Sequence, residues 1–221
     1  MQRELRAAAG LAAALLIILC SVTATTGVSQ QSFELVRAPD VYAQALVNAS
    51  FWLRTLIAID DLFVAAYVTT TVLLVMQLAP ARMTPLHWLV AGLGVAAAVL
   101  DLAENHHLLA LLRWANAGQA IPADEILRRS ELSQLKWMLG HTAFVGIGVL
   151  LPRAGGPVRD VFRMSLLFAQ LPIGALAWAV DDATWGAVLT WARYGSFVTG
   201  FAVIGWLAHV GFGEAATGAR E

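Results

Sequence analysis

The sequence predicts an all-α protein, a polytopic transmembrane helical bundle of six spans, or of five spans if the first segment is a cleaved signal. Of the 221 residues, 59% are hydrophobic and only 13% are charged, and the mean hydropathy is +0.69. This composition is typical of multi-pass helical membrane proteins rather than soluble domains. Long apolar segments also alternate with short polar connections. We therefore expect one integral membrane domain over residues 1–221.

The first apolar segment, residues 11–27, follows Arg3 and Arg6 and ends in small residues. This pattern is shared by cleaved signal peptides and by signal-anchor helices. We favour a retained first helix. Residues 28–50 are more polar and are expected to form an interfacial connection, in which Asp40 caps the start of the next helix. Residues 41–50 either lie along the interface or extend the next span.

A five-helix core is expected over residues 51–210. The predicted spans lie at about 51–78, 88–112, 132–151, 162–180 and 183–210. Asp124 is expected to cap the helix that continues into the span at 132–151. Pro172 and Gly174 predict a kink in the following span. The small and polar residues 211–221 are expected to form a disordered tail.

The span at 88–112 carries a polar stretch, LDLAENHHLL, between two tryptophans. Trp88 and Trp114 each lie 13 residues from Asp101, and tryptophan is favoured at membrane–water interfaces. Asp101 is therefore expected near the bilayer midplane. At ~100° per residue, Asp101, Glu104 and Asn105 share one helix face. Such groups either pair with basic residues to fix helix packing or form a functional polar site, and we favour the functional site.

Polar side chains of the other spans are expected at comparable depth. Asp60 and Tyr67 fall on one face of their helix, whereas Asp61 points to a more apolar side. The remaining members come from three spans and are His107, Lys136, His141 and Arg193. All of them lie ~9–18 Å deep when measured from the side that carries the odd-numbered connections. We therefore expect a polar cavity that opens on that side and is covered by the two longer connections there, with packed apolar core in the other half.

The acids of this predicted pocket outnumber its bases. The acidic residues are Asp60, Asp61, Asp101 and Glu104, and the basic residues are Lys136 and Arg193. A fully paired set of buried charges would serve packing alone. The excess acid instead requires protons, a metal ion, a cationic ligand or water, and this imbalance favours a functional site.

A metal site is the weaker interpretation. Asp60 or Asp61, Glu104, His107 and His141 are acceptable ligand types for zinc or iron. However, the sequence contains no HxxxH or HExxH pair, and the adjacent His106 and His107 point ~100° apart on a helix. No metal ligands are therefore predicted, and the cofactor stays unknown.

General acid–base chemistry on a lipid-like substrate fits the residue types. A carboxyl group in a low-dielectric pocket can carry a proton near neutral pH. Asp101 and Glu104 would be the catalytic acid–base pair, with Lys136 as the third catalytic residue and either Lys136 or Arg193 holding an anionic headgroup. The expected ligand-binding residues are Asp60, Asp61, Tyr67, Asn105, His107, His141 and Arg193.

Two other classes of function stay open. One is an accessory or assembly subunit of a larger membrane complex, for which buried charges serve packing. The other is a proton-coupled transporter, although inverted repeats and polar residues in the opposite half of the bundle are missing. An enzyme or a binding protein for an amphiphilic, lipid-like ligand remains the preferred interpretation.

Charge and cysteine usage limit the partners and the compartment. The net charge is −1, and no basic cluster is present, so no nucleic-acid partner is expected. The single cysteine, Cys20, excludes an intrachain disulfide. The expected partners are the lipid bilayer, a lipid-like small molecule and other membrane proteins. A slight excess of arginine on the even-numbered side predicts a bacterial inner-membrane protein whose pocket faces the periplasm or exterior.

Overall fold

A computed structural model describes residues 1–153, 156–179 and 183–212, and these residues form helices without any strand. The elements are α1 (Gln2–Thr26), η1 (Gln30–Phe33), α2 (Pro39–Leu78), α3 (Pro85–Asn116), α4 (Ala123–Leu150), α5 (Pro157–Phe168), α6 (Gln170–Ala179) and α7 (Ala183–Val210). The all-α prediction is confirmed for this part of the chain. Most of the predicted tail, residues 213–221, lies outside the described residues.

Four helices are long and apolar enough to cross a membrane: Gln2–Thr26, Pro39–Leu78, Pro85–Asn116 and Trp185–Val210. A fifth crossing is formed if the bent pair α5 and α6 counts as one span. These findings indicate a multi-pass membrane protein. The predicted number of six spans is not confirmed, because α4 does not meet the same criterion. The charged residues of α4 extend to Lys136, and the apolar remainder of the helix is short.

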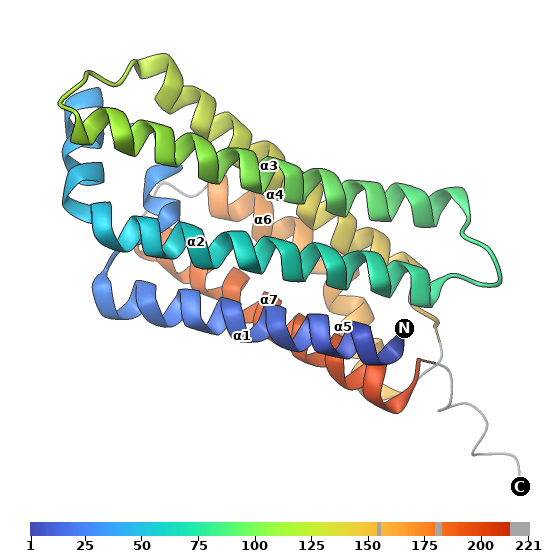
Figure 1. The fold of residues 1–221 in the computed structure, drawn as a ribbon. Coiled ribbons are helices and arrows are strands. Elements are labelled where there is room, and N and C mark those ends of the chain that lie inside the picture. The colour runs from blue at the N-terminus through green and yellow to red at the C-terminus, as the bar shows by residue number, and fades with distance from the viewer. Residues whose placement is uncertain (154–155, 180–182, 213–221) are drawn as a thin grey trace, which may run out of the picture.

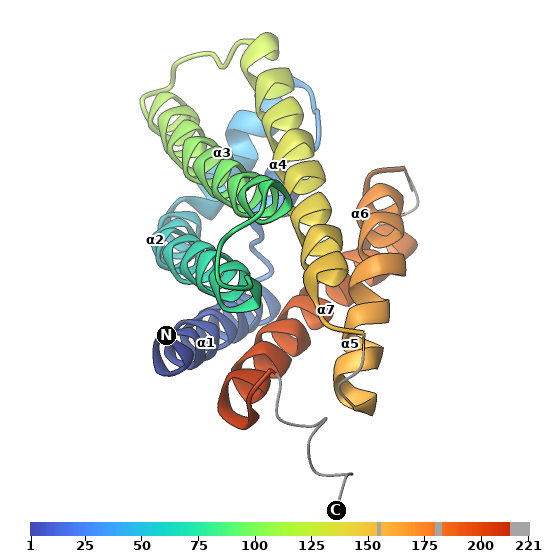
Figure 2. The ribbon, with the colours of Figure 1, turned by 90° about the vertical axis from the view of Figure 1, so that its right-hand side faces the viewer.

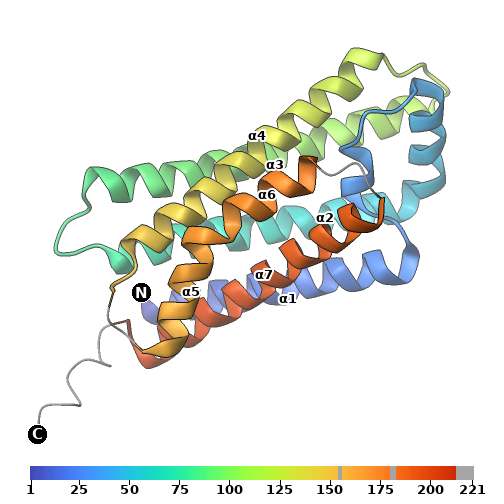
Figure 3. The same cartoon turned by 180° about the vertical axis from the view of Figure 1, so that it is seen from behind.

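The helices run back and forth along one long axis (Figures 1 and 3). The connections at residues 27–38 and 117–122 lie at one end, which we call the polar end. The connection at residues 79–84 lies at the other, apolar end (Figure 1). The first turns of α1 and the last turns of α7 also meet there, where Arg6 Nη1 lies 3.0 Å from His209 Nδ1. Figure 2 looks along the bundle and shows α1 beside α2 and α7, with α4 between α3 and the α5–α6 pair.

Two apolar clusters fill the bundle, with the polar side chains between them. The cluster at the polar end includes Leu53 and Ile57 of α2 and Leu108 of α3. The larger cluster fills the other half and includes Phe63 of α2. Asp60 lies between Ile57 and Phe63 along the same helix, so the polar groups form a layer between two apolar regions. The apolar core expected in the other half is present, but the polar end also holds an apolar cluster, so the expected polar half is reduced to this layer.

Two helices begin earlier than the sequence predicted. α2 begins at Pro39 with Ala38 as its N-cap, so Asp40 lies in the first turn and is not the cap. The last part of the predicted connection is therefore helical, and its turns run at an angle to the rest of α2 (Figures 1 and 3). In α4, Pro122 is the N-cap and Asp124 lies in the first turn. Both carboxylates still favour the helix start, because the N-terminal end of a helix dipole attracts negative charge.

The predicted kink is present between α5 and α6, which meet at an angle of 41°. Pro172 lacks a backbone N–H, and its ring would collide with the carbonyl of the residue four positions earlier, which is Phe168. Phe168 is the last residue of α5. Gly174 lets α6 approach α4 closely, because a Cβ atom there would lie 2.4 Å from Cδ2 of His141. The break therefore bends the helix pair while its second half packs on α4.

Candidate functional site

One face of α4 carries a row of polar side chains that points toward α3. Arg129, Ser133 and Lys136 follow each other at intervals of four and three residues, which places them on one helix face. All three are buried. Nζ of Lys136 lies 3.1 Å from Oδ1 of Asp101, and the Ser133 hydroxyl donates to Oε1 of Glu104 over 3.0 Å. The face predicted on α3 thus meets a matching face on α4.

Glu104 is the centre of an ion-pair cluster. Its Oε1 lies 3.0 Å from Nη2 of Arg129, and its Oε2 contacts Nζ of Lys136. Arg129 Nη1 also donates to the Glu104 backbone carbonyl over 2.9 Å. The Glu104 residue is only 1% exposed. Two cations of the chain therefore compensate this buried carboxylate.

The connection between α1 and α2 is tied down over this cluster. Arg129 Nε and the Tyr42 hydroxyl both donate to the Phe33 carbonyl, over 3.0 and 2.9 Å. The carboxylate of Glu34 lies 3.8 Å from Nζ of Lys136. This connection covers the polar end of the site, as expected for one of the two longer connections. The connection at 117–122 instead packs Ile121 into the apolar cluster.

Asp60 and Asp61 share one neutral partner. The Asn105 amide donates to Asp60 Oδ2 over 2.8 Å and to Asp61 Oδ1 over 2.9 Å. Asp61 was expected to point to a more apolar side, and that expectation is wrong because Asn105 draws it toward α3. The Tyr67 hydroxyl donates to Asp101 Oδ2 over 3.2 Å. Asp60 differs from Asp101 in having no cation partner among the described residues.

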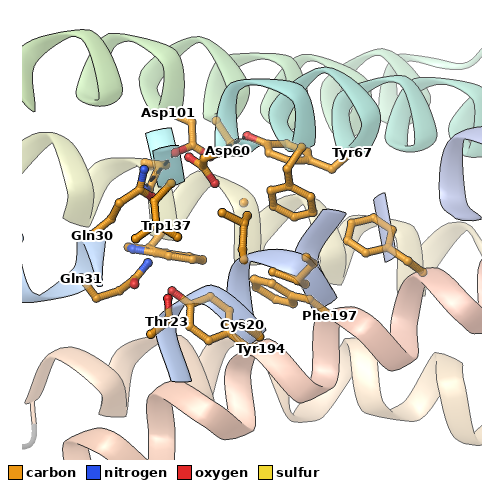
Figure 4. Close-up of a pocket in the computed structure, with 18 of the residues that line it drawn as sticks. Cys20, Thr23, Gln30, Gln31, Asp60, Tyr67, Asp101, Trp137, Tyr194 and Phe197 are labelled. Carbon is orange, nitrogen blue, oxygen red and sulfur yellow. Dashed lines mark hydrogen bonds and ion pairs between the residues drawn. The ribbon is translucent and has the colours of Figure 1, made fainter. Parts of the chain in front are cut away.

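A partly open cavity of about 90 Å³ lies beside these groups. Figure 4 shows Asp60, Asp101 and Tyr67 on one side and Trp137, Tyr194 and Phe197 across from them. The other lining residues come from α1, the first connection and the neighbouring helices: Leu16, Leu19, Cys20, Thr23, Gln30, Gln31, Leu56, Phe63, Ala97, Lys136, Gly140, His141, Phe144, Trp191 and Phe201. The cavity therefore has a carboxylate wall and an aromatic wall.

A second, larger depression of about 560 Å³ separates the α5–α6 pair from α7. We call it the apolar groove. Its lining is almost entirely apolar, with Gly195 and Gly200 leaving space on the α7 side. Val158 and Val161 on its rim are 45% and 69% exposed, so the groove opens on the outer surface of the bundle.

The cavity and the apolar groove adjoin. Phe144, Phe197 and Phe201 line both of them. The rings of Phe144 and Phe197 pack at a centroid distance of 5.3 Å. Three phenylalanine side chains therefore form the boundary that the cavity shares with the groove on the outer surface.

The structure brings together some of the predicted site residues and separates others. Asp60, Tyr67, Asp101, Lys136 and His141 line the cavity. Three residues lie behind its wall: Asp61, Glu104 and Asn105. Two lie elsewhere: His107 Nε2 pairs with Glu125 Oε2 at 2.9 Å, and the Arg193 guanidinium lies 3.7 Å from the centre of the Trp137 ring. Within the described ranges, no ion pair joins Arg193 to Asp60, Asp101 or Glu104.

Sequence reasoning missed Arg129, Glu34 and the aromatic wall. Arg129 precedes the predicted span at 132–151 and was not assigned to the pocket, but it is 1% exposed. Its spacing of seven residues from Lys136 could have placed it on the same helix face. No local signal identifies Glu34, because only tertiary folding of the connection brings it to Lys136. Trp137 and Tyr194 resemble the other aromatic residues of the spans and carry no distinguishing pattern.

In the part of the chain that the structure describes, no group of three or more His, Cys, Asp or Glu side chains is placed to hold a metal ion. The histidines are separated, since His107 pairs with Glu125 while His141 lies against Trp137 and Phe197. Comparison with known proteins found no matching family model, no matching curated protein and no matching solved structure. The function is therefore argued from the site itself.

Proposed function

We propose that this chain is a six-pass bacterial inner-membrane protein that binds an amphiphilic, lipid-like ligand, with the polar end facing the periplasm or exterior. The observation that carries the proposal is a small cavity with a carboxylate wall that adjoins a larger apolar groove on the bundle surface. A ligand with a small polar head and a long apolar chain matches both spaces. In a membrane, lipid chains have direct access to such a groove.

Six passes are supported by the arrangement of the helices. α4 lies between α3 and the α5–α6 pair and turns its charged face toward α3. A helix that is surrounded by neighbours can carry charge at bilayer depth, because its polar groups face the bundle interior. The first turns of α1 and the last turns of α7 lie at the same end, which agrees with an even number of passes. The arginine count favours that end as cytoplasmic.

The proposed head site consists of Asp60 and Asp101, with Tyr67 orienting Asp101. Glu104 holds Lys136 in place and does not contact the ligand in this account. Any acid–base step on the ligand would therefore use Asp101, which lines the cavity. The proposed tail site is the apolar groove between the α5–α6 pair and α7.

Binding is tested by native mass spectrometry and lipid analysis of the gently purified protein. Gly195 lines the groove, and a Cβ atom there meets nothing within 4 Å, so Gly195→Leu fills the groove without a backbone collision. Gly92 is the matched control, because it also lies in a helix, has the same open surroundings and lines neither space. We expect a stoichiometric amphiphile on the wild type and on Gly92→Leu, and its loss from Gly195→Leu.

Two results would overturn the proposal. One is a wild-type protein that carries no amphiphile after extraction in several mild detergents. The other is an amphiphile that stays equally bound to Gly195→Leu, which would place it outside the groove. A ligand-free chain that instead co-purifies with one membrane protein at fixed stoichiometry would favour an accessory or assembly subunit.

A further inference from the structure

We infer that the head of the bound amphiphile is a cationic amine, which occupies the cavity between the Asp60 carboxylate and the aromatic wall. This inference rests on the proposed function and names the class of headgroup. It differs from the anionic headgroup expected from the sequence, for which Lys136 or Arg193 would have been the partner. Lys136 lines the cavity but is already paired with carboxylates of the chain, and Arg193 is not one of the lining residues.

The cations of the site are already used by the chain itself. Lys136 contacts three carboxylates, those of Glu34, Asp101 and Glu104. Arg129 contacts Glu104 and the Phe33 carbonyl. An anionic headgroup would have to displace one of these buried contacts. A cationic headgroup displaces none of them.

Among the described residues, neither Asp60 nor Asp61 has a cation partner, and of these two carboxylates only Asp60 lines the cavity. It is 9% exposed, it lines the cavity, and its hydrogen bond comes from the neutral amide of Asn105. The neighbouring Asp101 is compensated by Lys136 at 3.1 Å. A buried carboxylate is stable when it is protonated or paired with a positive charge. An amine head in the cavity supplies that charge.

A second observation points to a polar ligand in the same cavity. His141 lines it and is only 2% exposed. Gln170 interacts with one ring nitrogen, so the other ring nitrogen is left without a hydrogen-bond partner among the described residues. Buried polar atoms are normally hydrogen-bonded. A neutral imidazole has one acceptor nitrogen, so an ammonium N–H can donate to His141 as well as to Asp60.

The opposite wall suits a cation. Tyr194 and Phe197 line the cavity together with Trp137 (Figure 4). Two cations of the chain already lie on the Trp137 ring, with Lys136 Nζ 4.9 Å and Arg193 Cζ 3.7 Å from its centre. Aromatic faces attract positive charge, and this attraction is stronger when the cation is shielded from water. Carboxylate and aromatic rings together are a recognition site for an amine.

Calorimetric titration of the full-length protein in a non-ionic detergent tests the inference with probes of equal chain length. The probes are octyltrimethylammonium, octylamine, octanol and octanoate. We expect the two cationic probes to bind at least about tenfold more tightly than octanol or octanoate. A tenfold difference in Kd is the size expected for pairing one charge with one carboxylate. Asp60→Asn should remove this preference and leave the affinity for octanol unchanged.

Asp61→Asn is the matched control, because Asp61 shares the Asn105 partner but does not line the cavity. It should retain the preference for cations. Phe197→Leu gives a second reading that does not depend on Asp60, since it keeps apolar bulk and removes the aromatic face. Phe197→Leu should lower the affinity for octyltrimethylammonium several-fold more than the affinity for octanol.

The outcomes separate the headgroup from the proposed function. If octanoate or octanol binds wild type as tightly as the cationic probes, the inference is wrong while amphiphile binding stands. If Asp60→Asn keeps the preference for cations, the site named here is wrong. If tetramethylammonium alone binds as tightly as octyltrimethylammonium, the amine site is supported, and the proposal that the apolar groove binds a lipid-like tail is wrong.

Discussion

Glu104 and Asp60 are both buried carboxylates near the middle of the bundle, and their surroundings differ. Glu104 lies between Arg129 and Lys136 and has no access to the cavity. Asp60 lines the cavity and receives its hydrogen bond from Asn105. The difference separates a structural region, in which each charge has a partner, from a binding region that the chain itself leaves incomplete. Burial of a carboxylate alone does not distinguish the two roles.

The largest effect should come from breaking the structural region. Arg129→Met removes a buried cation and two hydrogen bonds, and it leaves Glu104 with Lys136 alone. We expect a loss of about 3–5 kcal/mol in unfolding free energy, as for other buried pairs from which one partner is removed. Equilibrium unfolding in mixed micelles measures it. Adding Glu104→Gln in the same chain should recover part of the loss. If Arg129→Met alone leaves the unfolding free energy unchanged, the assignment of Arg129 and Glu104 to the structural region is wrong.

A smaller effect is expected where the first connection is tied to α2. Tyr42→Phe removes one of the two hydrogen bonds to the Phe33 carbonyl and keeps the edge-to-face ring contact. The expected loss is about 0.5–1.5 kcal/mol, because Arg129 still satisfies the carbonyl. The same unfolding measurement reports it, together with faster protease cleavage in the connection. A loss as large as that of Arg129→Met would mean that Tyr42 and not Arg129 anchors the connection.

The smallest effect on stability should come from Asp60→Asn. An asparagine amide keeps an acceptor for Asn105 and removes a charge that pairs with no cation among the described residues. We expect the unfolding free energy of the ligand-free protein to change by less than about 1 kcal/mol, well below a broken buried pair. A severe loss in ligand-free protein would show that Asp60 belongs to the structural region, and the comparison between the two carboxylates would fail.

Periodicity predicted the parts of this arrangement that depend on one helix at a time. It placed Asp101, Glu104 and Asn105 on one face of α3, and it located the bend in the α5–α6 pair from Pro172. It also gave a multi-pass helical membrane protein, although the count of six spans is not confirmed.

Contacts between distant segments could not be predicted in this way. Glu34 reaches Lys136 only because the first connection folds inward, and Asp61 turns because Asn105 on another helix holds it. Arg129 was not assigned to the pocket, because hydropathy gives depth along a helix and not the direction of a side chain. Arg193 was expected to bind the ligand in the pocket, whereas its guanidinium lies on the Trp137 ring and it is not among the cavity-lining residues.

The most direct test of the central claim compares two single variants that differ only in which carboxylate is lost. Asp60→Asn and Asp61→Asn remove adjacent charges that share the Asn105 partner, and only Asp60 lines the cavity. Native mass spectrometry should find the bound amphiphile on wild type and on Asp61→Asn, and little or none on folded Asp60→Asn. Equal retention of the amphiphile by both variants would contradict the account.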